Sequence, residues 1–283
     1  MARKCRLCPR ECGVDRTAGE RGVCGMDYGP VYSSANLHYG EEPPISGWSG
    51  SGTIFMTGCN LNCMFCQNYP ISQLRHGNET TVQSLARRML YLQRSGAHNI
   101  NFVTPTHQAA ALYESLLIAY REGLKIPIVY NSGGYDSVEM LKFWDGIVDV
   151  YMPDAKYGTD GPAKDLSNAP EYVRHNRAAL TEMHRQVGKL ELSEDGVARR
   201  GLLVRHLVLP GGLSATDEVL KWIAENLSPE TYISLMSQYF PTWRAFAHPV
   251  LHRPLNGAEY REAVEALERY RLDNGWTQPF RGA

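Results

Sequence analysis

The stretch "TIFMTGCNLNCMFCQN", residues 53–68, places three cysteines directly behind a short apolar run. Residues 53–57 have the length and composition of a buried strand. Cys59, Cys63 and Cys66 then follow with the spacing C-x3-C-x2-C. Three thiolates in one short loop favour an iron–sulfur cluster or zinc, both of which normally take four ligands. The loop therefore leaves one ligand position open, and an open iron can bind a substrate.

Short apolar runs recur along the chain after this loop, and segments of helical periodicity separate them. The predicted strands are 53–57, 100–104, 126–131, 148–153, 202–210 and 232–236. Nearly continuous apolar runs of this length are typical of parallel strands that are covered on both faces. Six β-α units with right-handed crossovers predict an α/β fold, namely an open, partial (β/α)6 TIM-like barrel.

Capping patterns and composition predict how the rest of the chain is organised. Helices are predicted to begin at Thr80 or Thr81, at Ser214-x-x-Asp217, and near Asn256 with Glu259 three residues on. We expect residues 1–32 to form a short metal-binding extension and the Gly/Ser/Pro-rich residues 33–52 to form a connecting segment. Residues 53–283 then form the barrel, which ends in the last helix.

The N-terminal stretch "CRLCPRECGVDRTAGERGVC", residues 5–24, contains the other four cysteines. Glycine, proline and charged residues outnumber apolar ones here, so the segment cannot bury a core and a bound metal is expected to hold it. Cys5, Cys8, Cys12 and Cys24 would close a coordination shell of zinc or of a fully ligated auxiliary 4Fe-4S cluster, and spacing does not separate the two. The alternative is a set of reduced thiols in a loosely ordered tail.

Composition limits the classes of partner. The 283 residues include 29 basic and 30 acidic ones, so the net charge of −1 gives no electrostatic argument for nucleic acid or an anionic membrane. No signal-peptide run and no stretch approaching the roughly 20 apolar residues of a membrane span is found. Seven cysteines in a reducing compartment are more readily metal ligands than disulfides. We therefore expect a cytoplasmic protein without nucleic-acid or membrane partners.

The C-x3-C-x2-C motif behind the first barrel strand, with Phe65 just before the third cysteine, resembles the signature of radical S-adenosylmethionine (radical SAM) enzymes. The resemblance implies a 4Fe-4S cluster whose open iron is chelated by the amino and carboxylate groups of SAM. An electron donor such as flavodoxin or ferredoxin would reduce the cluster. Cleavage of SAM then gives methionine and a 5'-deoxyadenosyl radical, which abstracts a hydrogen atom from the substrate.

Within this superfamily, "GCNLNCMFCQN" is similar to the activating enzymes of glycyl radical enzymes, such as pyruvate formate-lyase activating enzyme. An activating-enzyme-like branch shares the N-terminal pattern CxxCPRxCGVxRxxGExGxC, so the resemblance covers about residues 5–276. It implies a glycyl-radical-type protein as substrate. Relatives in natural-product pathways suggest a small-molecule alternative, such as a sugar epimerase. An iron–sulfur electron-transfer or sensor protein is the non-enzymatic alternative.

The resemblance also assigns provisional roles to residues at the ends of the later strands. It places SAM contacts on Phe65, Thr104, Thr106, Asn131, Asp154, Lys156, Arg205 and Gln238. Thr104–His107 stands where the family usually has Gly-Gly-Glu, which favours the sensor alternative, whereas the retained Asp154, Lys156 and Arg205 oppose it. An arginine in the otherwise apolar run 202–210 is costly unless it is paired, so Asp154 or a SAM carboxylate is the expected partner of Arg205.

Overall fold

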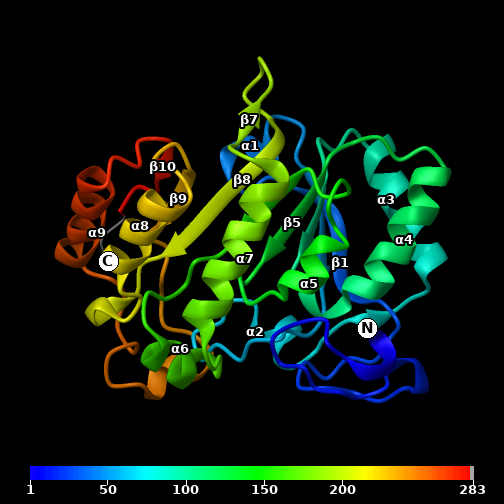
Figure 1. The fold of residues 1–283 in the computed structure, drawn as a ribbon, viewed down its shortest axis with the longest axis horizontal. Coiled ribbons are helices and arrows are strands. Elements are labelled where there is room, and N and C mark those ends of the chain that lie inside the picture. Colours follow the sequence, from blue (N-terminus) through cyan, green and yellow to red (C-terminus); the bar gives the residue numbers. More distant parts are fainter. Residues whose placement is uncertain (281–283) are drawn as a thin grey trace.

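The computed structural model describes residues 1–280, which form an α/β fold around one curved sheet (Figure 1). The strand order is β10-β9-β8-β6-β5-β4-β2-β1-β3. The six predicted strands are present and parallel, as β2 (Ser51–Met56), β4 (Ile100–Val103), β5 (Ile128–Ser132), β6 (Val150–Pro153), β8 (Ala198–Leu207) and β9 (Tyr232–Met236). The prediction of an open, partial barrel is confirmed. A further short strand, β10 (Gly275–Thr277), pairs parallel to β9 without a signal in the sequence.

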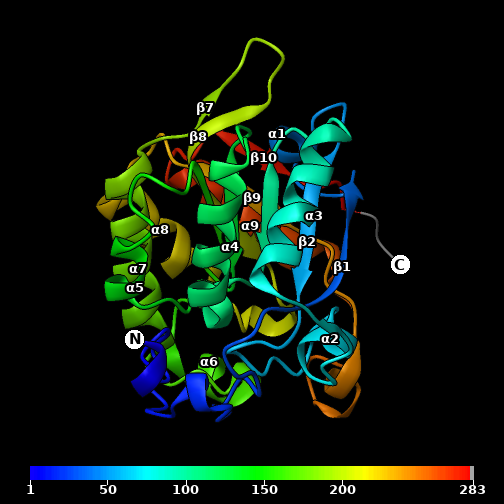
Figure 2. The same cartoon turned by 90° about the vertical axis from the view of Figure 1, so that its right-hand side faces the viewer.

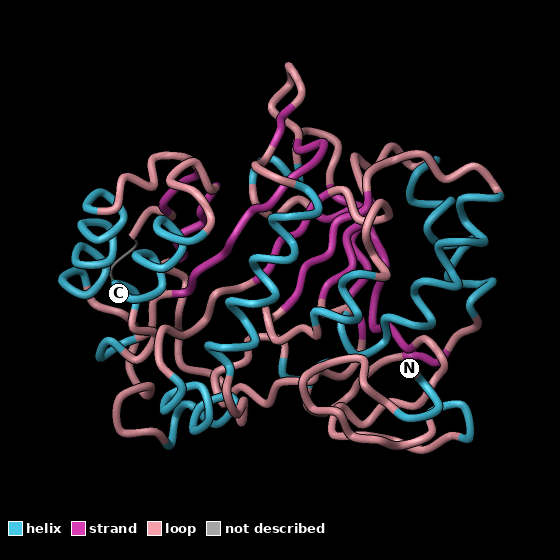
Figure 3. Tube along the Cα trace, viewed as in Figure 1, coloured by secondary structure: helices cyan, strands magenta, loops and turns pink. Residues whose placement is uncertain are grey.

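Helices cover the outer face of this sheet (Figure 3). The longer ones are α3 (Val82–Arg94), α4 (Ala109–Arg121), α7 (Tyr172–Val187), α8 (Thr216–Asn226) and α9 (Gly257–Arg269). The shorter ones are α1 (Pro43–Ser46), α2 (Tyr69–Ser72), α5 (Val138–Lys142) and α6 (Asp160–Ser167). All residues of β5 and β6 are buried, as their apolar composition predicts for strands covered on both faces. Among residues 1–280, no helix has the length and apolar character needed to cross a membrane.

Two of the three predicted helix starts are confirmed. The Thr81 side chain accepts a hydrogen bond from the Ser84 backbone N–H and caps α3. Asn256 and Glu259 form a capping box at the start of α9. The prediction at Ser214 is wrong, because α8 follows Ala215 in a left-handed conformation and has no side-chain cap. Asp217 instead accepts a hydrogen bond from the Tyr270 hydroxyl at 2.8 Å.

The segment expected only to connect the extension to the barrel contains a strand. Strand β1 (Val31–His38) pairs antiparallel with β2, and the two-residue β3 (Asn78–Glu79) pairs with β1. Serines and an asparagine in β1 lower its strand propensity, so its composition carries little signal for a strand. Another short strand, β7 (Glu191–Leu192), pairs with β8 in a hairpin that projects from one end of the molecule (Figure 2).

Residues 1–30, which we name the N-terminal unit, consist of turns and the short 3-10 helices Ala2–Lys4 and Arg16–Ala18. Figures 1 and 2 both show this unit at the end of the sheet toward which the parallel strands point, beside the segments around α2 and α6. In parallel sheets, the loops at this end carry the functional groups. The N-terminal unit is therefore placed against the loops that follow the barrel strands.

Close packing between β5, β6 and α7 fixes the loop ends at this edge. Gly134 has a φ of +71°, and a Cβ built there would lie 2.0 Å from the Asp154 carbonyl oxygen and 2.3 Å from Asn176 Nδ2. Asn176 Nδ2 donates to the carbonyl oxygens of Gly134 (2.9 Å) and Asp154 (3.0 Å). Only glycine fits here, and α7 thereby holds the ends of β5 and β6 together.

Gly134→Ala should lower the free energy of unfolding by about 3 kcal/mol, because it combines steric overlap with a left-handed conformation. Gly146→Ala is the matched control. Gly146 also has a positive φ, +78°, but no atom lies within 4 Å of the position that an added Cβ would take. Its loss should be about 1 kcal/mol, from the backbone conformation alone. Urea unfolding measures both values, and equal losses would contradict the role of close packing at Gly134.

Candidate functional site

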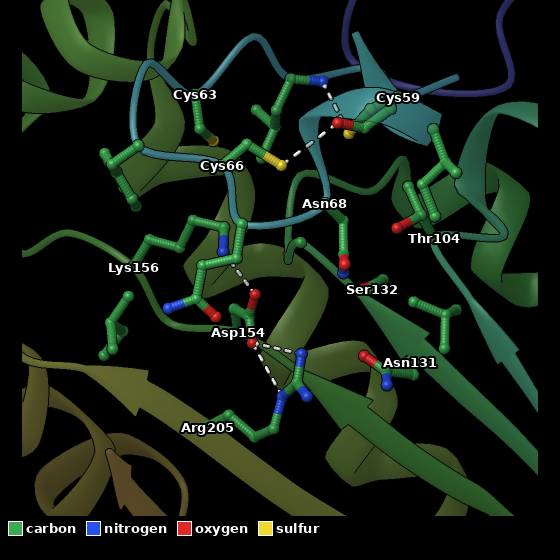
Figure 4. Close-up of a pocket in the computed structure, with 18 of the residues that line it drawn as sticks. Cys59, Cys63, Cys66, Asn68, Thr104, Asn131, Ser132, Asp154, Lys156 and Arg205 are labelled. Atoms are coloured by element: carbon green, nitrogen blue, oxygen red, sulfur yellow. Dashed lines mark hydrogen bonds and ion pairs between the residues drawn. The ribbon is translucent and has the colours of Figure 1, made fainter. Parts of the chain in front are cut away.

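A cavity of about 210 Å³ opens at the carboxyl ends of the parallel strands (Figure 4). The cysteine loop 59–66 after β2 lines one side of it, and side chains from β5, β6 and β8 line the other. The predicted site residues that the structure brings together are Cys59, Cys63, Phe65, Cys66, Thr104, Asn131, Asp154, Lys156, Arg205 and Gln238. These residues are widely separated in the sequence, and the barrel topology joins them.

Each of the three cysteine sulfurs has a hydrogen-bonding neighbour within the protein. The Leu61 backbone N–H donates to Cys59 Sγ at 3.3 Å, and the Ser167 hydroxyl donates to Cys63 Sγ at 2.9 Å. Cys66 Sγ lies 3.1 Å from the Ser72 hydroxyl oxygen. Hydrogen bonds to the ligand sulfurs orient them and help to set the potential of an iron–sulfur cluster. The surroundings of this triplet therefore suit cluster ligands.

Burial disfavours the ionised form of two of these thiols, Cys59 and Cys63. Burial raises the pKa of Cys59 well above its ordinary value, and the nearby Cys63 sulfur raises it further. Burial likewise raises the pKa of Cys63 to about 11, although the Lys156 ammonium opposes the shift. Thiolates, and not thiols, are the metal ligands, so these cysteines would ionise when a bound metal supplies the compensating positive charge. The residues present thus fit a three-cysteine 4Fe-4S cluster.

Opposite the cysteines, Asp154 forms ion pairs with two cations. Arg205 Nε and Nη2 lie 2.9 and 2.8 Å from Asp154 Oδ1, and the Lys156 ammonium contacts Oδ2 (Figure 4). Burial alone would raise the pKa of Asp154, but Arg205 and Lys156 bring it below its ordinary value. The carboxylate is therefore ionised at neutral pH. The predicted pairing of Arg205 with Asp154 is present.

Arg205 has a second acidic neighbour to which no sequence motif points. Glu42 Oε1 lies 3.8 Å from Arg205 Nη1, and the Glu42 side chain is buried. The adjacent Glu41 places its Oε2 3.5 Å from Asn131 Nδ2, at the limit of a hydrogen bond. Both glutamates precede α1 in a segment without a recognisable motif, so only the fold shows that they reach the barrel interior.

The β4 and β5 ends provide polar groups with different orientations. Thr104 lines the cavity with a φ of +62°, and its N–H donates to the Asn131 carbonyl oxygen at 2.8 Å. A left-handed threonine is strained, and such residues cluster at functional sites. Thr106, by contrast, does not line the cavity. Its hydroxyl instead donates to Asp136 Oδ1 at 2.6 Å, because that buried carboxylate needs hydrogen-bond donors.

Phe65 and Gln238 join the cysteine loop to the end of β9. Phe65 lines the cavity and packs edge-on against Tyr239, with ring centroids 6.1 Å apart. Gln67 Nε2 donates to the Gln238 carbonyl oxygen at 3.0 Å. Further lining residues outside the predicted set of site residues include Asn68, Ser132, Leu207 and Met236. Their position next to predicted residues is the only signal for them.

The other four cysteines all belong to the N-terminal unit, and none of them lines this cavity. Cys5, Cys8 and Cys24 are buried, and Cys12 is partly buried. As the side chains stand in residues 1–280, no three histidine, cysteine, aspartate or glutamate side chains are grouped to hold a metal ion. Metal binding by the N-terminal cysteines therefore stays a prediction at this point.

Comparison with known proteins identifies the family. Residues 53–190 match the sequence pattern of the Radical SAM superfamily. The uncharacterised protein MJ0674 of Methanocaldococcus jannaschii is 30% identical over 284 residues, which cover 96% of this chain and 76% of that protein. A second uncharacterised protein of that organism, MJ0808, is 26% identical over 156 residues, covering 49% of this chain and 45% of its own. The chain belongs to the radical SAM superfamily, whose members use a 4Fe-4S cluster and SAM.

Solved structures share the fold at low sequence identity. HydG, a maturase of the FeFe-hydrogenase, superposes with a TM-score of 0.50 and 13% identity, covering 79% of this chain and 50% of HydG. Streptococcus suis SuiB bound to S-adenosylmethionine superposes with a TM-score of 0.51 and 15% sequence identity, covering 78% of this chain and 48% of SuiB. The matched part of this chain thus spans about half the length of these solved proteins. The likeness agrees with the open barrel described above.

Arg205→Met should lower the free energy of unfolding by about 3 kcal/mol, since it removes one of the two cations that neutralise buried Asp154. Arg253→Met is the matched control. Arg253 also pairs with a carboxylate, Glu259, but its side chain is 38% exposed, so the loss should stay below about 1 kcal/mol. Denaturant titration under reducing conditions measures both. A loss for Arg205→Met as small as that of the control would contradict the role of the buried ion pairs.

Proposed function

We propose that this protein is a radical enzyme of the activating-enzyme type, whose substrate is a glycyl-radical-type protein. The single observation that carries the enzymatic part is the three-cysteine loop, which faces the Asp154, Lys156 and Arg205 side chains across one cavity. When bound, the 4Fe-4S cluster and SAM supply an electron and a 5'-deoxyadenosyl radical that abstracts a hydrogen atom. Flavodoxin or ferredoxin in the cytoplasm is the proposed source of the electron.

The residues of this chain have separable tasks in that reaction. Cys59, Cys63 and Cys66 would hold the cluster, and three protein ligands would leave one iron free for the ligand. Lys156 and Arg205 place two cationic hydrogen-bond donors on the wall opposite the cysteines. The carboxylates of Asp154 and Glu42 balance their charge, and the donors can bind a ligand carboxylate such as that of SAM. Phe65 offers an aromatic surface for the adenine. A sensor or electron-transfer protein would have no use for this charged set opposite the cluster.

The choice of substrate rests on the use of the cysteines and on the shape of the site. All seven cysteines have a ligand role in the proposal, so none remains as the hydrogen-atom donor that an epimerase needs. A glycyl radical stays on the partner protein and needs no donor. The cavity also shares Arg205 and Gln238 with a second one of about 440 Å³ between residues 40–43 and 276–279. This opening at the free edge of the barrel supports entry of an extended peptide loop.

The small-molecule alternative, such as sugar epimerisation, depends on another donor. Tyrosine is the residue type available, with 16 in the chain. Tyr239 packs against Phe65, the proposed adenine surface, but it is buried and its hydroxyl donates to the Leu251 carbonyl oxygen. This engagement makes Tyr239 a poor donor, so the small-molecule reaction would need another of the tyrosines.

Cys63→Ala should abolish reductive cleavage of SAM, because two cysteines cannot hold the site-differentiated cluster. Anaerobically reconstituted protein is treated with a strong reductant, and 5'-deoxyadenosine is measured by chromatography. Thr181→Ala, an exposed position on α7, should leave the rate unchanged. SAM cleavage that survives Cys63→Ala would refute the enzymatic proposal.

The substrate class can be tested by following the abstracted hydrogen. A glycyl-radical-type protein labelled with deuterium at glycine should transfer deuterium into 5'-deoxyadenosine and acquire a protein radical visible by electron paramagnetic resonance (EPR). Deuterium transfer from labelled nucleotide sugars, with none from the glycine-labelled protein, would contradict activation of a glycyl radical protein. It would support the small-molecule reaction instead.

A further inference from the structure

Arg16 is a buried cation without a carboxylate partner. It is 2% exposed, and within residues 1–280 no aspartate or glutamate forms an ion pair with its guanidinium. Its Nε and Nη2 donate to Cys5 Sγ and Cys24 Sγ, each at 2.9 Å. Nη1 donates to the backbone carbonyl oxygens of His107 (2.8 Å) and Asp27 (3.3 Å).

These contacts raise a question of charge balance. A guanidinium stays charged under all ordinary conditions, and an isolated charge is costly to bury. Backbone carbonyls satisfy two of its hydrogen bonds but add no net negative charge. The two cysteine sulfurs are the partners that can supply that charge, as metal-bound thiolates. The planar fork of Arg16 also holds the two sulfurs side by side, as donors next to metal ligands commonly do.

We propose that the N-terminal unit binds a thiophilic metal, zinc or an iron–sulfur cluster, through Cys5, Cys24 and their neighbours Cys8 and Cys12, with Arg16 as the buried counter-ion. Cys8 is buried in the same unit, and Cys12 Sγ accepts a hydrogen bond from the Val23 N–H at 3.5 Å, one residue from Cys24. Metal binding turns the Cys8 and Cys12 sulfurs toward the pair that Arg16 already holds. The four thiolates close the shell, so this site binds no SAM.

The position of this metal site gives it a task, because the N-terminal unit contacts both residues that flank Cys59. A Cβ built on Gly58 would lie 3.0 Å from the Cys24 carbonyl oxygen, so the two backbones lie too close together for a side chain at this position. On the other side, Arg10 Nε donates to the Asn60 carbonyl oxygen at 2.9 Å. The metal site therefore braces the first ligand of the radical cluster.

A hydrogen-bonded path from Arg16 reaches the same loop. The His107 carbonyl oxygen accepts from Arg16, while His107 Nε2 lies 2.8 Å from the Thr57 carbonyl oxygen, two residues before Cys59. His107 is fully buried, and its Nε2 would lie 3.1 Å from a Cβ built on Gly58. Arg16 is thus a positioning residue that acts on the loop of the radical cluster through His107, in addition to its contacts with Cys5 and Cys24.

The N-terminal site can be tested by itself in the full chain. A Cys59/Cys63/Cys66→Ala triple variant lacks the radical cluster, so metal that remains belongs to the N-terminal unit. Mass spectrometry for metals should find about one zinc or about four irons per chain. Adding Arg16→Met should lower this content several-fold, and Arg16→Lys should restore most of it. Arg6→Met, an exposed position in the same unit, is the control and should change nothing.

A metal-free triple variant, or full metal content after Arg16→Met, would overturn the proposal. Cys8→Ser in the triple variant checks it independently, even if Arg16→Met fails to fold, since cobalt bound at the site should show weaker thiolate charge-transfer absorption by about one thiolate in four. Unchanged absorption would overturn the assignment of Cys8. With the radical-cluster cysteines intact, Arg16→Met should lower the iron bound at Cys59, Cys63 and Cys66, and unchanged iron would refute the bracing role. None of these readouts depends on SAM cleavage, so the result is independent of the proposed function.

Discussion

Three neighbouring thiols at the carboxyl ends of parallel strands, one buried and two partly buried, can ionise together only if a cation lies among them. Cys59, Cys63 and Cys66 meet this condition, because burial raises the pKa of the first two and their sulfurs repel one another once ionised. The rest of the site follows from the need to hold such a charged centre in place. Each sulfur has a hydrogen-bonding neighbour, and the cavity in front of them is open to a ligand.

The wall of the cavity opposite the cysteines also contains a buried negative charge, and permanently charged side chains neutralise it. Asp154 is buried but ionised, because Arg205 and Lys156 both contact it. Helix α7 fixes the backbone under this group through Asn176 and through the Tyr172 hydroxyl, which donates to the Asp154 carbonyl oxygen at 3.1 Å. The packing of one outer helix therefore determines where the charged wall stands relative to the cysteines. Stability and ligand binding depend on the same few contacts.

Much of this arrangement is predictable from local sequence. The strands are apolar runs of the right length, and Arg205 stands out as a charged residue within one of them, which predicts a buried partner. The features that local sequence misses depend on contacts between distant segments. Strand β1 is specified by its pairing with β2 and not by its own composition, and Glu42 reaches Arg205 only through the fold. The position of Thr106 after a strand predicts a site residue, but buried Asp136 binds its hydroxyl instead.

The N-terminal unit shows the same limit. Its cysteine spacing predicts a metal, whereas the role of Arg16 emerges only when Cys5 and Cys24 are seen around its guanidinium. The close approach of Cys24 to Gly58 then links the two cysteine sets. The sets have different proposed roles but are adjacent in space. Hydrogen bonds and close backbone contacts thus connect Arg16 in the N-terminal unit to the cysteine loop that lines the cavity.

The central claim is that the three-cysteine loop leaves one iron open and that SAM binds to it. Electron nuclear double resonance on the reduced protein, with SAM labelled by 15N at the amino group, tests this most directly. We expect a hyperfine coupling between that nitrogen and the cluster, and the 15N coupling should be lost when unlabelled SAM replaces the labelled one. A reduced cluster that shows no coupling at saturating SAM would contradict the claim.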